Sequence, residues 1–305
     1  AIRAMCSFPD FNPNTYNEAE SVDVYNNTAI FTPYEPGSVF KPIGMAGAIN
    51  EGILEPESVF HDTGSREGLC SKPIRNAEFK AYGDQTMTGV LVHSINTGMV
   101  YVVDRLGKEK FREYIERFGF GVSMGIEVDK EETGTVESLR QNQDGEFDCY
   151  AATAAFGQGI TVTPLQLASA YGTIANGGVL MRPYIVEEIR HANGKKETTA
   201  PKELRRVLEP RTASLLSGML VTVVEKGEGR LSRVPEYYLA GKTGTAQIAG
   251  PGGYTDAFNH SFVGFGPADD PKFVAVIKFE RPTVNYASYT AAPVFKDIAR
   301  MTLEY

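Results

Sequence analysis

Two apolar, β-rich runs near the C-terminus, separated by turn residues, most constrain what this chain can fold into. Residues 261–265 (SFVGF) and 273–279 (FVAVIKF) are joined through Asp269-Asp270-Pro271, whose residue types favour a turn. Strands joined by so short a connection pair as an antiparallel hairpin. The residues that follow, 292–305, predict a helix that packs on the sheet. We therefore expect a mixed α/β fold whose sheet is at least partly antiparallel.

The rest of the chain predicts a third strand and a largely helical middle region. Period-two alternation marks a strand within 238–247, and the alternating residues 1–5 (AIRAM) resemble the interior of another strand. A helix is predicted to begin at Ser38, directly after a breaker at Glu35-Pro36-Gly37. Further helices are predicted over 86–93, 97–106, 108–118, 164–175 and 211–224.

Composition and charge indicate a globular protein and disfavour polyanionic partners. The 305 residues, 42% of them hydrophobic, can bury a substantial core as one large domain or two lobes. Thirty basic against 38 acidic residues give a formal net charge of −8, which argues against binding of nucleic acid or acidic lipid. No apolar run approaches the roughly 18 residues needed to cross a bilayer.

The cysteines and histidines form no pattern typical of a disulfide framework or a metal site. Cys6, Cys70 and Cys149 are widely spaced and contain no C-x-x-C pair, so we predict neither a disulfide framework nor a zinc site. The histidines also lack metal-ligand spacing: His61, His93, His191 and His260. No metal or other cofactor is expected.

Three short motifs carry the chemistry that the sequence predicts. Ser38 and Lys41 lie three residues apart at a predicted helix start, which places a hydroxyl and an amine on one face. The helix N-terminus also offers N–H groups to a developing oxyanion. Ser94-Ile95-Asn96 falls between two predicted helices, and Lys242-Thr243-Gly244 falls on a predicted strand. Each motif alone has an ordinary structural explanation, but their order is the signature of serine acyl-transferases that bind penicillin.

Through these motifs, the chain resembles the transpeptidase domain of a class B penicillin-binding protein. The similarity extends to residues 34–42 (YEPGSVFKP), 156–164 (FGQGITVTP) and 240–247 (AGKTGTAQ), and it covers nearly the whole chain. It implies the penicillin-binding-protein and serine β-lactamase-like fold, an antiparallel central sheet flanked by helices. The implied lobes are an α/β lobe at about 1–50 and 210–305 and a mostly helical lobe at about 51–209. Residues 260–265 resemble the division type slightly more than the elongation type.

The resemblance also implies a role for each motif residue. Ser38 is the expected nucleophile, and Lys41, its pKa lowered by burial beside Lys242, is the expected general base. Ser94 is expected to relay a proton, and Asn96 to position Lys41 and the substrate amide. The expected substrate-binding residues are Lys242, Thr243, Gly244 and Thr245, with the backbone N–H groups of Ser38 and Thr245 as the oxyanion hole.

One structural expectation tests this assignment. Strict strand alternation puts Lys242 and Thr245 on opposite faces, so we predict a twist or bulge at Gly244, where a missing Cβ also admits the substrate backbone. A regular strand there would count against the assignment. The glycine-rich residues 248–259 are predicted to be a surface loop beside the same groove.

The same resemblance implies partners and a location. The expected substrates are peptidoglycan stem peptides, with a D-Ala-D-Ala donor and an amine acceptor, and β-lactam antibiotics are the expected inhibitors. Family members act outside the cytoplasmic membrane, so we expect a parent protein with an N-terminal anchor and a pedestal domain. Glycan-polymerase, divisome or elongation-complex proteins are expected to contact those regions.

Four alternatives stay open on the sequence. A class A β-lactamase uses Ser-Asp-Asn and a deacylating Glu, but Ile95 replaces that Asp and the surroundings of Glu137 do not match. A D,D-carboxypeptidase would share every catalytic residue. A non-catalytic scaffold that senses muropeptide or β-lactam would not need all five motif residues, which are Ser38, Lys41, Ser94, Asn96 and Lys242. A nucleotide-binding loop at Gly241-Lys242-Thr243 would need glycine where Glu236 stands.

Overall fold

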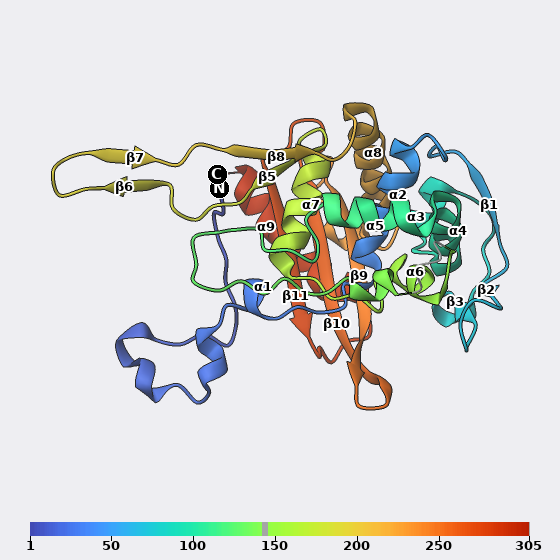
Figure 1. The fold of residues 1–305 in the computed structure, drawn as a ribbon, viewed down its shortest axis with the longest axis horizontal. Helices are drawn as coiled ribbons and strands as arrows, with labels where there is room; N and C mark the ends of the chain where they lie inside the picture. The colour runs from blue at the N-terminus through green and yellow to red at the C-terminus, as the bar shows by residue number, and fades with distance from the viewer. Residues whose placement is uncertain (142–145, 305) are drawn as a thin grey trace.

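The computed structural model describes residues 1–141 and 146–304, and a three-stranded antiparallel sheet lies at its centre (Figure 1). Its strands are β9 (Ala240–Gly250), β10 (Gly253–Gly266) and β11 (Phe273–Glu280), in the order β11-β10-β9. The β10–β11 pair is the hairpin that the sequence predicts. The strand predicted within 238–247 is confirmed as β9, which forms an edge of this sheet.

Alternation along β10 gives the sheet two differently covered faces. Phe262 packs against Phe295 of helix α9 (Ala291–Glu304), their ring centroids 4.6 Å apart. The next residue, Val263, faces the main core, which helices α2 (Lys41–Asn50), α7 (Pro164–Ala175) and α8 (Pro210–Lys226) build on the other face. The closing helix expected at 292–305 is therefore present and packs on the sheet; Tyr305 lies outside the described residues.

The helices of the middle region follow the predicted ranges closely. α7 begins after Thr163, whose side chain accepts from the Gln166 N–H while the Gln166 side chain accepts from the Thr163 N–H, a complete capping box. The remaining helices are α1 (Thr28–Phe31), α3 (Met87–Val92), α4 (Asn96–Leu106), α5 (Lys108–Arg117) and α6 (Cys149–Ala154). Short 3-10 helices are η1 (Pro13–Glu18), η2 (Val22–Tyr25), η3 (Gly37–Phe40), η4 (Ala77–Phe79), η5 (Glu137–Arg140), η6 (Arg230–Ser232) and η7 (Ala287–Tyr289).

Two expectations about strands and loops were wrong. Residues 1–5 form no strand, because among the described residues only the Ile2 N–H is bonded to other backbone there, to the Tyr184 carbonyl. Residues 248–259 belong to the β9–β10 hairpin and are not a loop. Besides its helices, the region 51–209 also holds short antiparallel pairs among the described residues: β1 (Val59–Asp62) with β4 (Gly83–Thr86), β2 (Ser65–Arg66) with β3 (Ile74–Arg75), β5 (Val179–Arg182) with β8 (Lys202–Arg206), and β6 (Glu188–Arg190) with β7 (Lys196–Thr198).

A disulfide corrects the cysteine prediction. Cys70 and Cys149 are bonded across 79 residues of sequence, and Cys6 is free and exposed. The bond joins the segment before β3 to the first residue of α6, beside a small apolar cluster around Val100 and Phe156. Sequence spacing could not indicate this pair, because the fold alone brings the two segments together.

Two further findings concern the described residues as a whole. No helix among them is both long and apolar enough to cross a membrane. They also contain no group of three or more His, Cys, Asp or Glu side chains arranged to hold a metal ion.

Candidate active site

The turn that carries Ser38 is held from two sides. Ser38 lies in η3, which runs directly into α2, so the predicted helix start is preceded by one 3-10 turn. The Gly37 N–H donates to the Gly157 carbonyl (3.0 Å), and the buried Tyr171 hydroxyl donates to the Val39 carbonyl (2.8 Å). Ser38 itself stays partly exposed. The Ser38 hydroxyl therefore lies on a fixed turn and is accessible from outside.

Lys41 occupies the first position of α2 and is fully buried. Its Nζ donates to the Ser94 carbonyl and, at 3.1 Å, to Ser94 Oγ. Burial lowers the pKa of Lys41 well below its ordinary value, and the Lys242 ammonium lowers that pKa further, whereas Glu228 opposes the shift. A lysine with a lowered pKa can accept a proton near neutral pH, which is what a general base must do.

Ser94 and Asn96 lie where α3 gives way to α4. Ser94 adopts a positive φ of 55°, an uncommon conformation that turns its hydroxyl and carbonyl toward Lys41. Asn96 is the first residue of α4, and its Nδ2 donates to the Arg75 carbonyl at 3.0 Å. Among the described residues, hydrogen bonds join Lys41 to Ser94 and Asn96 to Arg75 of β3, and none is found between Asn96 and Lys41.

A buried carboxylate fixes the start of α4, and sequence reasoning did not identify it. Asp62 accepts hydrogen bonds from the Gly64 N–H (3.0 Å), Asn76 Nδ2 (2.8 Å), the Tyr82 N–H (2.9 Å) and Thr97 Oγ1. The Thr97 N–H in turn donates to Asn76 Oδ1 at 3.1 Å. Because Thr97 directly follows Ser94-Ile95-Asn96, this network positions that motif.

Strand β9 corrects the prediction of a bulge at Gly244. Its pairing with β10 is continuous from Ala240 opposite Phe265 to Gln247 opposite Phe258, and the only register shift lies between Tyr254 and Phe258. A Cβ on Gly244 would lie 2.9 Å from the Pro36 carbonyl oxygen and 2.6 Å from Ser261 Oγ. The glycine therefore serves close packing against the turn that carries Ser38, and no bulge is needed for that. The regular strand counts against the part of the assignment that placed the Lys242 and Thr245 side chains together at one ligand group.

The regular strand separates the roles expected of Lys242 and Thr245. Lys242 is fully buried, but its long side chain folds back so that Nζ lies 3.3 Å from both Thr243 Oγ1 and the Thr243 carbonyl. Thr245 Oγ1 instead accepts from the Ala287 N–H at 3.2 Å. The side chains that converge on one point are thus Lys242 and Thr243, without Thr245.

Glu228 completes this cluster and was also missed by the sequence analysis. Its Oε2 accepts from Thr243 Oγ1 at 3.0 Å and lies 3.7 Å from Lys242 Nζ. Burial lowers the pKa of Lys242, and the Glu228 carboxylate opposes that shift. A Cβ on Gly227 would lie 2.6 Å from the Val92 carbonyl oxygen, so glycine at 227 lets this loop approach the end of α3. In the sequence, only Gly227-Glu228-Gly229 directly after α8 could have indicated that this acidic residue lies on a close-packed loop.

The β9–β10 hairpin is tied to the nucleophile segment. Glu35 Oε1 accepts from the Gly159 N–H (3.0 Å) and from the Tyr254 hydroxyl (3.3 Å). Burial raises the pKa of Glu35, and these two hydrogen bonds oppose that rise. Through Tyr254 and Glu35, the hairpin is therefore joined to the segment that leads into the turn of Ser38.

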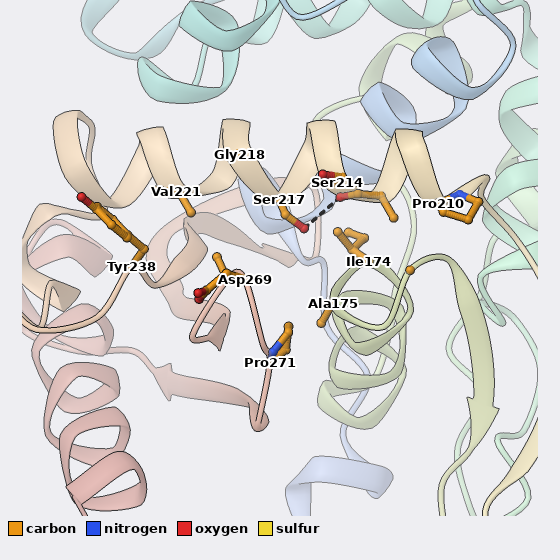
Figure 2. A pocket seen from close by; sticks show the side chains of 13 residues that line it. Ile174, Ala175, Pro210, Ser214, Ser217, Gly218, Val221, Tyr238, Asp269 and Pro271 are labelled. Atoms are coloured by element: carbon orange, nitrogen blue, oxygen red, sulfur yellow. Dashed lines mark hydrogen bonds between the residues drawn. The ribbon is translucent and has the colours of Figure 1, made fainter.

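The residues that a class A β-lactamase would use for hydrolysis do not meet among the described residues, and a separate cavity lies away from the motif residues. Ile95 is buried, and the Glu137 carboxylate pairs with Arg140 Nη1 at 3.2 Å on the exposed helix η5. A separate cavity of about 600 Å³ lies between α7, α8 and the β10–β11 turn, lined in part by Ser217, Tyr238 and Asp269 (Figure 2). None of the motif residues lines it.

Known proteins resemble this chain throughout its length. A family model described as the penicillin binding protein transpeptidase domain matches residues 1–300. Stage V sporulation protein D of Bacillus subtilis (strain 168) is 38% identical over 99% of this chain and 47% of its own length. The chain therefore spans about half the length of that curated relative.

Solved structures agree with the sequence comparison. Penicillin binding protein 3 from Mycobacterium tuberculosis, complexed with aztreonam, has a TM-score of 0.83 and 31% identity, covering 92% of this chain and 64% of that one. The D,D-transpeptidase domain of a peptidoglycan glycosyltransferase from Eggerthella lenta has a TM-score of 0.84 and 25% identity, covering 98% of this chain and 75% of that one.

Proposed function

Because this chain belongs to the penicillin-binding protein transpeptidase family, we propose that it is a serine D,D-transpeptidase that cross-links peptidoglycan stem peptides and is inhibited covalently by β-lactams. The observation that carries the proposal is the buried Lys41 amine, bonded to Ser94 beside the partly exposed turn of Ser38. This arrangement supplies a nucleophile, a base of lowered pKa and a hydroxyl relay within one site.

In the acylation step, Ser38 Oγ attacks the carbonyl of the penultimate D-Ala. Lys41 takes the hydroxyl proton, an ester bond to Ser38 forms, and the amide bond to the terminal D-Ala breaks. Ser94 passes a proton from the lysines to the leaving amine. An acceptor amine from a neighbouring strand then attacks the ester carbonyl, so that the new amide bond forms and the ester bond to Ser38 breaks. A proton lost by the amine is taken by Lys41 and returned to Ser38 Oγ.

Recognition of the donor uses β9 and its neighbours. Lys242 and Thr243 bind the terminal carboxylate of the donor, and the Ser38 and Thr245 backbone N–H groups form the oxyanion hole. Because β9 is an edge strand among the described residues, its open side can pair with an extended peptide that lies over Gly244. Asn96 positions the substrate amide with its side-chain amide, which keeps its carbonyl oxygen and one N–H beside the bond that Nδ2 donates to the Arg75 carbonyl.

The proposed location is the outer face of the cytoplasmic membrane, with the parent anchored by a transmembrane helix. The Cys70–Cys149 disulfide supports an oxidising compartment. Cell division is the favoured role, because residues 260–265 resemble the division type of the family slightly more than the elongation type. Glycan-polymerase and divisome or elongation-complex proteins are the proposed partners of regions outside this chain.

Intact mass spectrometry after incubation with benzylpenicillin tests the function. The parent protein should gain one drug mass and keep it for many minutes, while Ser38→Ala should gain none and retain the parent's melting temperature. A synthetic peptide ending in D-Ala-D-Ala, supplied with an acceptor amine, should release D-Ala and yield the amide product.

The other possible outcomes identify the alternatives. Rapid loss of the adduct with accumulation of hydrolysed drug would identify a β-lactamase. Release of D-Ala without amide product would identify a D,D-carboxypeptidase. A folded parent protein that forms no adduct and releases no D-Ala would leave the non-catalytic scaffold as the better explanation.

A further inference from the structure

The carboxylate of Glu228 already contacts Thr243 and Lys242, the two residues proposed to bind the carboxylate of the donor. Glu228 Oε2 accepts the Thr243 Oγ1 hydrogen bond at 3.0 Å and lies 3.7 Å from Lys242 Nζ. Lys242 and Thr243 are buried, whereas the Glu228 side chain is 51% exposed and so lies at the open side of the cluster. Glu228 thus stands between solvent and the two groups.

The surroundings keep Glu228 in that place. Gly227 packs against the Val92 carbonyl at the end of α3, and Gly229 packs against the Val223 carbonyl of α8. The backbone of the loop is therefore confined between the α3 end that precedes Ser94 and the C-terminal turn of α8. Only the side chain is free to leave the cluster, because half of it already faces solvent.

We propose that Glu228 is a specificity-determining residue that competes with the carboxylate of the incoming donor or β-lactam for Lys242 and Thr243. This inference rests on the proposed function. A ligand carboxylate that reaches Thr243 Oγ1 must displace Glu228 and then lies next to its negative charge. Like charges only a few ångströms apart repel even when partly solvated, so Glu228 slows acylation by an anionic ligand relative to a neutral ligand of the same shape.

A purely structural role for Glu228 makes a different prediction. If the side chain served only to hold Thr243 and Lys242, a variant that keeps the hydrogen bond would behave like the parent protein. Glutamine is such a variant, because its Oε1 can accept from Thr243 Oγ1 while the negative charge is lost. Charge and hydrogen bonding can therefore be separated by comparing Glu228→Gln with Glu228→Ala.

The experiment compares acylation by benzylpenicillin and by its methyl ester, followed by intact mass spectrometry at fixed pH and salt. Glu228→Gln should raise the second-order rate constant for benzylpenicillin about fivefold to tenfold and change that for the ester less than twofold. The matched control is Glu236→Gln, which removes the same charge from an exposed residue and should leave both rate constants within twofold of the parent values. Glu228→Ala also removes the charge, so it should likewise raise the rate constant for benzylpenicillin more than that for the ester.

Several results would overturn the inference. Equal changes for the two probes, or a lower rate with benzylpenicillin in Glu228→Gln, would contradict competition for the carboxylate site. A longer adduct lifetime with unchanged acylation would instead assign Glu228 to activation of water. Failure of the proposed function has a separate signature, since the parent protein would then form no Ser38-dependent adduct with either probe.

Discussion

Lys41 is the residue at which function and stability most directly conflict. Its amine is buried beside a second buried lysine, and its Nζ bonds only to the carbonyl and hydroxyl of Ser94 among the described residues. Protonation there costs stability, because a buried cation without a carboxylate in contact is poorly compensated. In the proposed mechanism, a neutral amine at Lys41 is what acylation of Ser38 requires.

We predict that Lys41→Met raises the free energy of unfolding by about 1–2 kcal/mol at pH 7 and abolishes acylation. The pKa of Lys41 is lower in the folded than in the unfolded state, so between those pKa values the unfolded state binds more protons and parent stability rises with pH. The gain from Lys41→Met should therefore be larger at pH 6 than at pH 9.

Urea denaturation at the two pH values measures this effect. Lys202→Met, at an exposed position of β8, is the matched control and should leave the free energy of unfolding within about 0.5 kcal/mol of the parent value. A Lys41→Met protein that is less stable than the parent at both pH values would contradict the prediction.

At the scale of elements, the catalytic groups depend on how helix starts and strand edges are anchored. The Ser94 motif lies at the junction of α3 and α4. The Asp62 carboxylate, at the end of β1, is bonded to Thr97 of α4, to Asn76 just after β3 and to Tyr82 just before β4. Such a buried network is stable only while its donors all keep their acceptor.

We predict that Asp62→Ala lowers the free energy of unfolding by about 2–4 kcal/mol and slows acylation, because buried donors lose their acceptor and the Ser94 motif loses its anchor. Thr97→Val, which removes one of those hydrogen bonds, should cost about 1–2 kcal/mol. Thermal and urea denaturation measure stability, and mass spectrometry measures acylation.

The control for this element is Asp84→Ala in β4. Asp84 is exposed and pairs only with the exposed His61 among the described residues, at 2.6 Å, so its loss should change stability by less than about 0.5 kcal/mol. Asp62→Ala with the stability and acylation rate of the parent would show that the network does not support the motif.

For the molecule as a whole, the Cys70–Cys149 disulfide closes a long loop that contains α3, α4 and α5. Cross-linking residues so far apart restricts the unfolded chain strongly. Removing it with Cys70→Ala/Cys149→Ala should lower the free energy of unfolding by about 2–4 kcal/mol. Urea denaturation of this variant and the parent, both with intact Ser38, measures the loss.

Cys6→Ala is the control for that measurement, because Cys6 is exposed and unbonded and its loss should leave the urea midpoint unchanged. Reduction of the parent protein with dithiothreitol should reproduce the lowered midpoint of the double variant. An unchanged midpoint in the double variant would mean that the disulfide adds nothing to the stability of the fold.

The sequence by itself determined which residue types are available, in what order and on which local elements. Period-two and helical patterns gave β9, the β10–β11 hairpin and helices such as α7, because those patterns arise from neighbours within one turn or one pleat. The order of Ser38, Lys41, Ser94, Asn96 and Lys242 was enough to indicate the family. Each motif falls on a local element that the sequence predicts: a helix start, the junction of two helices, and a strand.

Only the tertiary structure decided what meets across long separations. The Cys70–Cys149 bond, the Asp62 network and the contact of Glu228 with Thr243 join segments whose spacing follows no local period. The regular course of β9 at Gly244 was also a tertiary outcome, because close packing against Pro36 uses the missing Cβ. Local patterns specify elements, whereas the charge and hydrogen-bond partners of a site depend on how those elements pack.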